Sequence, residues 1–403
     1  MCINSYKIHY IIFIIVILIF GGIHLIGPVT GRHLALLYMV GLNHKEMGKL
    51  WHHRLFNIYM IFIFIFGITS FYYGYFDHFM HDVLAYYIPS YIVCWSTYIL
   101  ISKNNSIDSL ITTLILIGIF NGFVTIGQYF NNPIAFSVPL LLEVSGHEGI
   151  IDILLNTLNT DTNNFSLYGI FGPVSNGYFS SVVSVLILAY LSKWNKSIVL
   201  IVWIFLLFSL FCVQQRTAFV VGVFGSLYLF VKQYDTLSTL NKICVLLIVL
   251  LSIIFILNTL DISQMFQDSR YKDFSLGSRE QIYAQSIRYI ETNLFTANYY
   301  HYASIFVMPP HNLFYNMLVY GTLLGAIPLI IVFLTLLKKA MTNVFTVINN
   351  CNTTLIALSI SFVVYNLNSL THNASIVTGD ILFWLLSTPI MYYSEKTRCN
   401  HLN

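Results

Sequence analysis

Residues 313–336 read LFYNMLVYGTLLGAIPLIIVFLTL, a run with no charged residue. An α-helix rises about 1.5 Å per residue, so about 20 apolar residues cross the roughly 30 Å hydrocarbon core of a membrane. Similar runs recur along the chain of 403 residues, which is 57% hydrophobic and only 9% charged. A soluble domain carries about 25% charged residues. The composition therefore indicates a membrane protein.

The apolar runs predict about twelve membrane spans. Because lipid offers the backbone no hydrogen-bond partner, and because the alternating pattern of a barrel strand is missing, each span is expected to be a helix. The fold class is an all-α, polytopic transmembrane helical bundle, with residues 1–403 forming a single integral membrane domain. The predicted spans are 8–27, 33–43, 55–75, 83–101, 107–130, 174–192, 197–213, 217–231, 243–260, 313–336, 353–371 and 376–393.

The distribution of basic residues predicts the orientation. With the N-terminus in the cytoplasm, thirteen of the 19 Lys and Arg residues fall on the inner side, as the positive-inside rule requires. The span at 33–43 is too short to cross unaided, but without it the positive excess would point outward. Twelve spans also leave the C-terminus inside. The long loops at 131–173 and 261–312 then lie outside.

Cysteine and histidine spacing gives no metal signature. None of the six Cys residues falls in a long outer loop, and neither CxxC nor HExxH occurs. We therefore predict no disulfide framework, no metal site and no cofactor.

Two arginines on the outer side are candidates for binding or catalysis. Arg216 sits between two apolar spans with almost no loop, where a cation opposes the topology rule. The alternative is an arginine that only sets the depth of its span. Arg279 begins a stretch with apolar residues at helical spacing, which predicts an amphipathic helix with Ser278 as its N-cap. The alternative is a solvated arginine paired with Glu280 or Asp273.

His311 and Asn312 follow two prolines and precede the run at 313–336. The rigid Pro309-Pro310 lead places them at the outer mouth of a span. An imidazole there can accept a proton near pH 7. The alternative is that His311 or Asn312 only caps the following helix.

Asp380 is expected about one turn inside the last span, at its outer end. Carboxylates inside a membrane are costly and usually have partners, and His372 and Arg216 are the candidates. The alternative is an acid that interacts with the positive end of the helix dipole.

Arg288, in the second outer loop, is a weaker candidate for substrate binding. Acids in the first loop could bind sugar but are better read as a solvated face: Glu143, Glu148, Asp152 and Asp161.

Three segments in order resemble the O-antigen ligase/polymerase superfamily. They are Gly169-Ile170-Phe171-Gly172-Pro173 with Asn176; Gln215-Arg216-Thr217-Ala218; and Ser278-Arg279-Glu280 followed by Pro310-His311-Asn312, Tyr320-Gly321 and Gly325. The matches cover about residues 165–330. The chain departs from the family pattern in having Gln215 where Ser is usual. Thr296-Ala297-Asn298 also stand where a Gly-x-Gly is common, and no outer-loop Arg has a Gly eleven positions later.

The resemblance implies the GT-C fold class and a polymerase of the bacterial inner membrane with two long periplasmic loops. Its substrate would be an undecaprenyl-diphosphate-linked oligosaccharide, with membrane lipid around it, a chain-length regulator as a candidate partner and no role for nucleic acid. The implied reaction is inverting glycosyl transfer. Arg216 and Arg279 would bind the diphosphate, with His311 as first choice of base and Asp380 or Glu280 as second. Arg288 and Asn312 would bind substrate.

Three other functions stay open at this stage, and one of them is a structural or sensory membrane protein. An O-antigen ligase, which passes the finished chain to lipid A–core, shares the pattern and the chemistry. A lipid-linked oligosaccharide flippase is a different class. It would be expected to carry charged residues along a central cavity, whereas the predicted spans hold almost none beyond Asp108 and Asp380.

Overall fold

The computed structural model describes residues 3–21, 23–26, 29–49, 54–104, 107–142, 167–233, 279–306, 308–346, 353–371 and 375–400. The span predicted at 243–260 lies outside these residues. So do positions 143–166 and 261–278 of the two long loops, with the acids of the first loop, the expected cap Ser278, and His372.

The described residues are helical apart from one short two-stranded hairpin. The elements of the first part are α1 (Ile3–Ile19), β1 (His24–Ile26), β2 (Val29–Thr30), α2 (Gly31–Asn43), the 3-10 helix η1 (His44–Lys49), α3 (Arg54–Tyr72), α4 (Phe76–Asp82), the π-helix η2 (Val83–Tyr87), α5 (Ile88–Asn104), α6 (Asp108–Tyr129) and α7 (Pro133–Leu141). Those of the second part are α9 (Pro173–Leu186), the 3-10 helix η4 (Ile187–Tyr190), α10 (Lys196–Cys212), α11 (Arg216–Gln233), α14 (Arg279–Thr292), α15 (Tyr299–Ile305), α16 (Leu313–Phe345), α17 (Thr353–Ser369) and α18 (Ile381–Asn400).

Four helices are long and apolar enough to cross a membrane. They are Arg54–Tyr72, Phe76–Asn104, Asp108–Tyr129 and Leu313–Phe345. Five shorter apolar helices accompany them: Tyr6–Ile19, Val174–Tyr190, Lys196–Cys212, Thr353–Ser369 and Ile381–Tyr393. The prediction of a helical bundle suited to a membrane is confirmed at this level.

Every predicted span within the described residues coincides at least in part with a helix, but four differ notably from it. The last span was predicted from position 376, whereas its helix α18 begins only at Ile381. The first helix ends at Ile19, where the Gly-Gly pair 21–22 disfavours helix and the β1–β2 hairpin follows. The span at 83–101 is only part of a continuous helix from Phe76 to Asn104. The run at 313–336 bends at Thr322, whose φ of 57° interrupts α16.

The bend in α16 follows from its contacts. The amide of Leu323 donates to the carbonyl oxygen of Leu294 at 2.8 Å, outside the helix. At Gly321, directly before Thr322, a Cβ atom would lie 2.9 Å from the Phe62 ring of α3. The glycine therefore lets α16 pack closely on α3, the helix with which it shares its largest contact.

Helix α17 is the centre of the bundle. It packs against α9, α11, α16 and α18, and all but three of its 17 residues are buried. Its contact with α11 depends on Gly225, where a Cβ atom would lie 2.4 Å from Cγ2 of Val364. Small residues at such crossings allow helices to approach closely.

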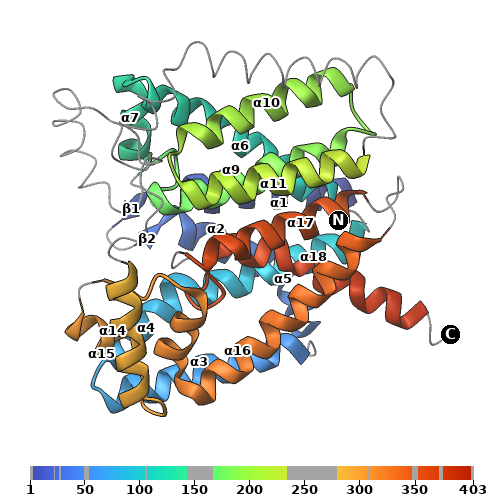
Figure 1. Ribbon diagram of the computed structural model, residues 1–403. Helices are drawn as coiled ribbons and strands as arrows, with labels where there is room; N and C mark the ends of the chain where they lie inside the picture. Colours follow the sequence, from blue (N-terminus) through green and yellow to red (C-terminus); the bar gives the residue numbers. More distant parts are fainter. Residues whose placement is uncertain are drawn as a thin grey trace.

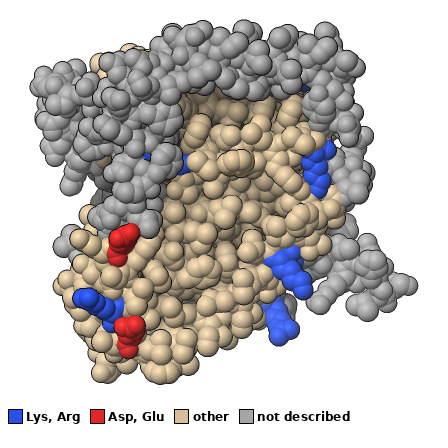
Figure 2. Space-filling model, viewed as in Figure 1, with Lys and Arg blue, Asp and Glu red and all other residues tan. Residues whose placement is uncertain are grey.

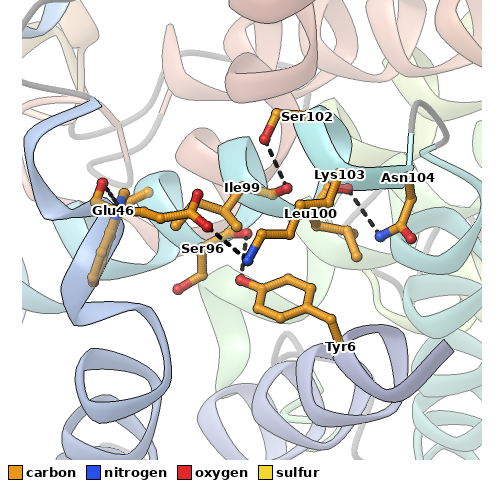
Figure 3. Close-up of polar contacts among 9 residues, drawn as sticks. Tyr6, Glu46, Ser96, Ile99, Leu100, Ser102, Lys103 and Asn104 are labelled. Carbon is orange, nitrogen blue, oxygen red and sulfur yellow. Dashed lines mark hydrogen bonds and ion pairs between the residues drawn. The ribbon is translucent and has the colours of Figure 1, made fainter. Parts of the chain in front are cut away.

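The bundle has two distinct ends. The end with the β1–β2 hairpin, α7, α14 and α15, at the left of Figure 1, is called the hairpin end here, and the opposite end, where both termini lie, the terminal end. At the terminal end the ammonium group of Lys103 pairs with Glu46 at 2.8 Å (Figure 3). The indole Nε1 of Trp95 donates to the Glu46 carbonyl at 3.0 Å. These contacts join α5 to η1.

Charged side chains gather toward the two ends of the molecule. In Figure 2 they flank a broad band in which the described residues show neither Lys, Arg, Asp nor Glu. Large apolar side chains are exposed on many helices, among them Phe64, Ile201, Phe224 and Leu334. Exposed apolar surface of this extent needs a cover, and lipid is the cover that the apolar helices suit.

We predict that Gly225→Ala destabilises the protein, because the new methyl group must push α11 and α17 apart. Overpacking of this kind costs about 1–3 kcal/mol. Gly41→Ala is the matched control, since a Cβ atom there meets nothing within 4 Å and an alanine gains about 1 kcal/mol of helix propensity. Thermal unfolding in detergent should give a lower Tm for the first variant only. Equal Tm values for both would contradict this packing.

Candidate functional site

A network of buried amides holds the chain at the start of α9. Asn176 is fully buried, and its Nδ2 donates to the Leu167 carbonyl at 2.9 Å. Its Oδ1 accepts from Nδ2 of Asn121, in α6, at 2.7 Å. The irregular segment 167–172 is thereby tied to two helices through one side chain.

Two further hydrogen bonds from α6 complete this network. Oδ1 of Asn121 accepts from the Ile170 amide, and Oε1 of Gln128 accepts from the Gly169 amide, both at 2.9 Å. Gly169 has a φ of 50°, and a Cβ atom there would lie 2.3 Å from Oδ1 of Asn121. Only glycine fits this position. The first of the three family-like segments is therefore a hydrogen-bonded clamp.

The second segment is held against the first. The Leu167 amide donates to the Val213 carbonyl at 3.1 Å, and Nε2 of Gln215 donates to the Val174 carbonyl at 3.4 Å. The Gln215 side chain occupies the space over Gly177, where a Cβ atom would clash with it. Gln215 therefore has a packing role that needs a glycine opposite it.

Arg216 follows directly as the first residue of α11 and is half-buried. Its neighbours Gln214 and Gln215 are buried. The first turn of a helix presents free backbone N–H groups and the positive end of the helix dipole. Arg216 thus adds its charge to a place already favourable to anions.

His311 and Asn312 lie where the sequence predicts, at the start of α16. Oδ1 of Asn312 accepts from the amides of Phe314 and Tyr315 at 2.9 and 3.3 Å, so the capping role is confirmed. Its Nδ2 donates to the carbonyl of Leu370, at the end of α17, at 3.1 Å. His311 is half-buried with a φ of 49°. A left-handed backbone at a residue other than glycine costs about 1–2 kcal/mol, and such strain often marks a functional position.

The expectation that Asp380 lies one turn inside the last span is wrong. Helix α18 begins at Ile381, and Asp380 precedes it. Its Oδ1 accepts from the amides of Leu382 and Phe383 at 2.7 and 3.2 Å. The buried Tyr365 lies beside the same carboxyl group. The geometry matches the alternative reading, an acid at the positive end of a helix.

The segment before Asp380 is held by side chains of α3, η2 and α5. The Tyr59 hydroxyl donates to the Ile376 carbonyl at 3.2 Å, and the Tyr87 hydroxyl to the Val377 carbonyl at 2.9 Å. The Ser90 hydroxyl donates to the carbonyl of Gly379. The backbone that carries the Asp380 carboxyl group is therefore held in place by three side chains.

Arg279 and Arg288 belong to α14 at the hairpin end (Figure 1). The helix predicted to begin near Arg279 begins there. Its buried face passes through Ile282, Ser286, Tyr289 and Ile290, whereas Arg288 is exposed on the other side. The side chain of Arg279 lies outside the described residues.

One further polar pairing was missed by sequence reasoning. The Tyr300 hydroxyl of α15 donates to Oδ2 of Asp82, at the end of α4, at 2.6 Å. Burial and the hydrogen bond to Asp82 raise the pKa of Tyr300 above its usual range, so the phenol stays protonated and donates. Burial likewise raises the pKa of Tyr289, in α14, to about 12. The cap residue Asn298 before an aromatic run was the one available signal for α15.

The described contacts bring most of the predicted positions to one end of the bundle. Gln215 and Arg216 adjoin the start of α9, and Asn312 adjoins the end of α17. Between them, Nδ2 of Asn368 in α17 donates to Oγ of Ser181 in α9 at 2.9 Å. The helices that begin at Arg216, Leu313 and Ile381 therefore share the hairpin end.

Comparison with protein-family models and with curated proteins finds no significant match to this chain.

We predict that Asn176→Ala destabilises the protein more than the loss of an ordinary helix cap. It leaves the Leu167 carbonyl and the Asn121 amide without these partners, at about 1–3 kcal/mol for each buried group. Asn195→Ala is the control, because Asn195 caps α10 at an exposed position and such a cap contributes about 1 kcal/mol. A Tm for Asn176→Ala at or above that of Asn195→Ala would contradict the clamp.

Proposed function

We propose that this protein polymerises undecaprenyl-diphosphate-linked repeat units of a surface polysaccharide at the outer face of a bacterial inner membrane. The observation that carries the proposal is the meeting of the family-like segments at one end of the bundle. The segments around Asn176, Arg216 and Asn312 are far apart in sequence, yet all belong to the hairpin end. Taken with the resemblance, this arrangement supports a twelve-span protein of the GT-C class.

The orientation follows from charge. Basic residues of the described chain gather at the terminal end, where the positive-inside rule puts the cytoplasm. They include Arg54, Lys103, Lys193, Lys196, Lys232, Lys338 and Lys339. The hairpin end then faces the periplasm, with both chain ends inside. A lipid-linked donor is the natural energy source there, because the periplasm contains no nucleotide sugars.

The reaction joins two lipid-linked chains. A hydroxyl on the non-reducing sugar of the acceptor attacks the anomeric carbon of the donor and inverts it. The bond from that carbon to the diphosphate oxygen breaks, and undecaprenyl diphosphate leaves with the electron pair. Arg216 and Arg279 each begin a helix, so guanidinium and helix dipole act together on the departing diphosphate.

The base that takes the acceptor's proton is His311. Asp380 is less suited, because its Oδ1 already accepts two backbone hydrogen bonds. We assign Asp380 to positioning the start of α18, and Asn312 to fixing the peptide beside His311. Arg288, exposed on α14, is available to the acceptor sugars.

The polyprenyl chain needs an apolar channel beside the bundle. A groove with a volume of about 480 Å³ lies between α3 and α4. Its lining is almost wholly apolar: Met60, Ile63, Phe64, Gly67, Ile68, Phe71, Phe76, Phe79, Met80 and Val83. Such a surface suits hydrocarbon and supports a lipid-linked substrate.

The first test is the lipopolysaccharide of a deletion strain carrying single variants. We expect Arg216→Ala and Arg279→Ala to leave a single repeat unit on the core, since losing one preorganised charge contact costs about 100-fold or more in rate. Arg-to-Lys should also be harmful, because lysine cannot bind two phosphate oxygens in the same way. Arg54→Ala, at the terminal end, is the control.

Silver-stained gels separate the outcomes. Normal long-chain polysaccharide from both Ala variants would exclude Arg216 and Arg279 as the residues that bind the diphosphate. A core with no repeat unit in the deletion strain would indicate the ligase instead.

The strain at His311 gives a second test. Glycine tolerates the left-handed backbone at position 311, so we expect His311→Gly to keep the Tm of the unaltered protein. The same variant should lose at least about 100-fold in polymerisation rate, the usual worth of a general base. His311→Ala should lose both stability and activity. Full activity of His311→Gly would exclude the histidine as the base.

A further inference from the structure

A polymerase of lipid-linked chains must bind two diphosphates at the same time. The donor carries one and the acceptor carries another. Arg216 and Arg279 account for the donor, whose diphosphate leaves. A second cation near the hairpin end is needed for the acceptor. This reasoning rests on the proposed function.

Arg32 is such a cation. It lies in the first turn of α2 and is half-buried. Its Nη1 donates to the Ala85 carbonyl in the π-helix η2 at 3.1 Å. Its Nε is buried and has no hydrogen-bond partner within the described part of the chain. A buried N–H group without a partner is costly, and an anion bound to the rest of the guanidinium would offset that cost.

Hydroxyl-binding groups surround the same turn. The Tyr86 side chain is 44% exposed, and its phenol is near enough to interact electrostatically with Arg32 and Tyr300. Tyr300 in turn donates to Oδ2 of Asp82, directly before η2. Short π-helical segments like η2 are frequent at functional sites.

The elements that carry these groups are held rigidly. Asn298 is fully buried and caps α15, with its Nδ2 donating to Oγ of Ser70 in α3 at 2.9 Å. On the far side of Tyr86, a Cβ atom at Gly379 would touch its Cβ at 3.2 Å. Tyr86 therefore adjoins the segment that leads to Asp380, and it connects that segment to the surroundings of Arg32.

We propose that Arg32, Asp82, Tyr86 and Tyr300 form the acceptor site. Arg32 binds a phosphate oxygen of the acceptor's diphosphate, and Asp82 with the two phenols binds hydroxyls of its sugars. The Asp82 carboxylate would oppose the negative charge that develops on a leaving diphosphate, whereas the acceptor's diphosphate does not leave and gains no charge. The carboxylate and the phenols can also accept from and donate to the acceptor's sugar hydroxyls. This composition favours the acceptor over the donor.

The experiment follows the acceptor alone. The product keeps the acceptor's lipid, so a repeat unit on farnesyl diphosphate is chased into a longer product while the natural undecaprenyl-linked donor is saturating. A second acceptor carries the same repeat unit on a neutral farnesyl glycoside. Membranes with each variant are assayed for KM and kcat with both acceptors.

We expect Arg32→Gln to raise KM for the diphosphate acceptor at least 10-fold with kcat within 3-fold, and to leave KM for the neutral acceptor unchanged. The unaltered protein should itself prefer the diphosphate acceptor at least 10-fold. Tyr300→Phe should raise KM for both acceptors. Tyr302→Phe, on the same helix but bonded to Ser286, should raise neither.

Three results would overturn the acceptor site. One is an equal effect of Arg32→Gln on both acceptors, which would mark Arg32 as structural. Another is an unaltered protein that uses both acceptors alike, a result that needs no variant to fold. The third is equal KM values for Tyr300→Phe and Tyr302→Phe. If the unaltered protein makes no polymer from the natural lipid-linked donor, the proposed function itself has failed.

Discussion

The hydrogen bonds of Asn176 are the interaction on which the hairpin end depends. In an apolar surrounding, a peptide group without a partner is costly, so an irregular segment can exist only where side chains satisfy it. Asn176, with Asn121 and Gln128 from α6, does this for residues 167–172. The segment and the start of α9 then form a fixed surface on which Gln215 packs, directly before the first residue of α11.

The same solution recurs at the other helix starts of this end. Asn312 satisfies two amides of α16 and one carbonyl of α17, and Asp380 satisfies two amides of α18. Each of these polar residues thus caps the first turn of a helix. Asn312 also bonds to the end of α17, and Asp380 lies beside Tyr365 of α17. The consequence is that several positive helix ends lie at one face of the bundle, which suits an anionic substrate. Structure and proposed chemistry therefore depend on the same few side chains.

Much of this fold could be predicted from the sequence, because apolar length alone marks a membrane helix. The helix beginning at Arg279 and the cap at Asn312 followed from local pattern and are confirmed. Asp380 was misplaced, because hydropathy put the start of the last span at position 376, whereas helix α18 begins only at Ile381. The pairing of Asp82 with Tyr300 joins positions 218 residues apart, and no single-sequence pattern reports such a contact. The bend at Thr322 likewise depends on neighbours from other helices.

The central claim is that the hairpin end faces away from the cytoplasm. Labelling of single cysteines with a membrane-impermeant maleimide, in intact cells with a permeable outer membrane and in a variant without native cysteines, measures this directly. Ser304 of α15 and Ser192 at the terminal end are both exposed. The account predicts that Ser304→Cys reacts from outside and that Ser192→Cys reacts only after the inner membrane is opened. The reverse pattern would contradict it, since an outer-face enzyme could not then present these helix ends to its substrate.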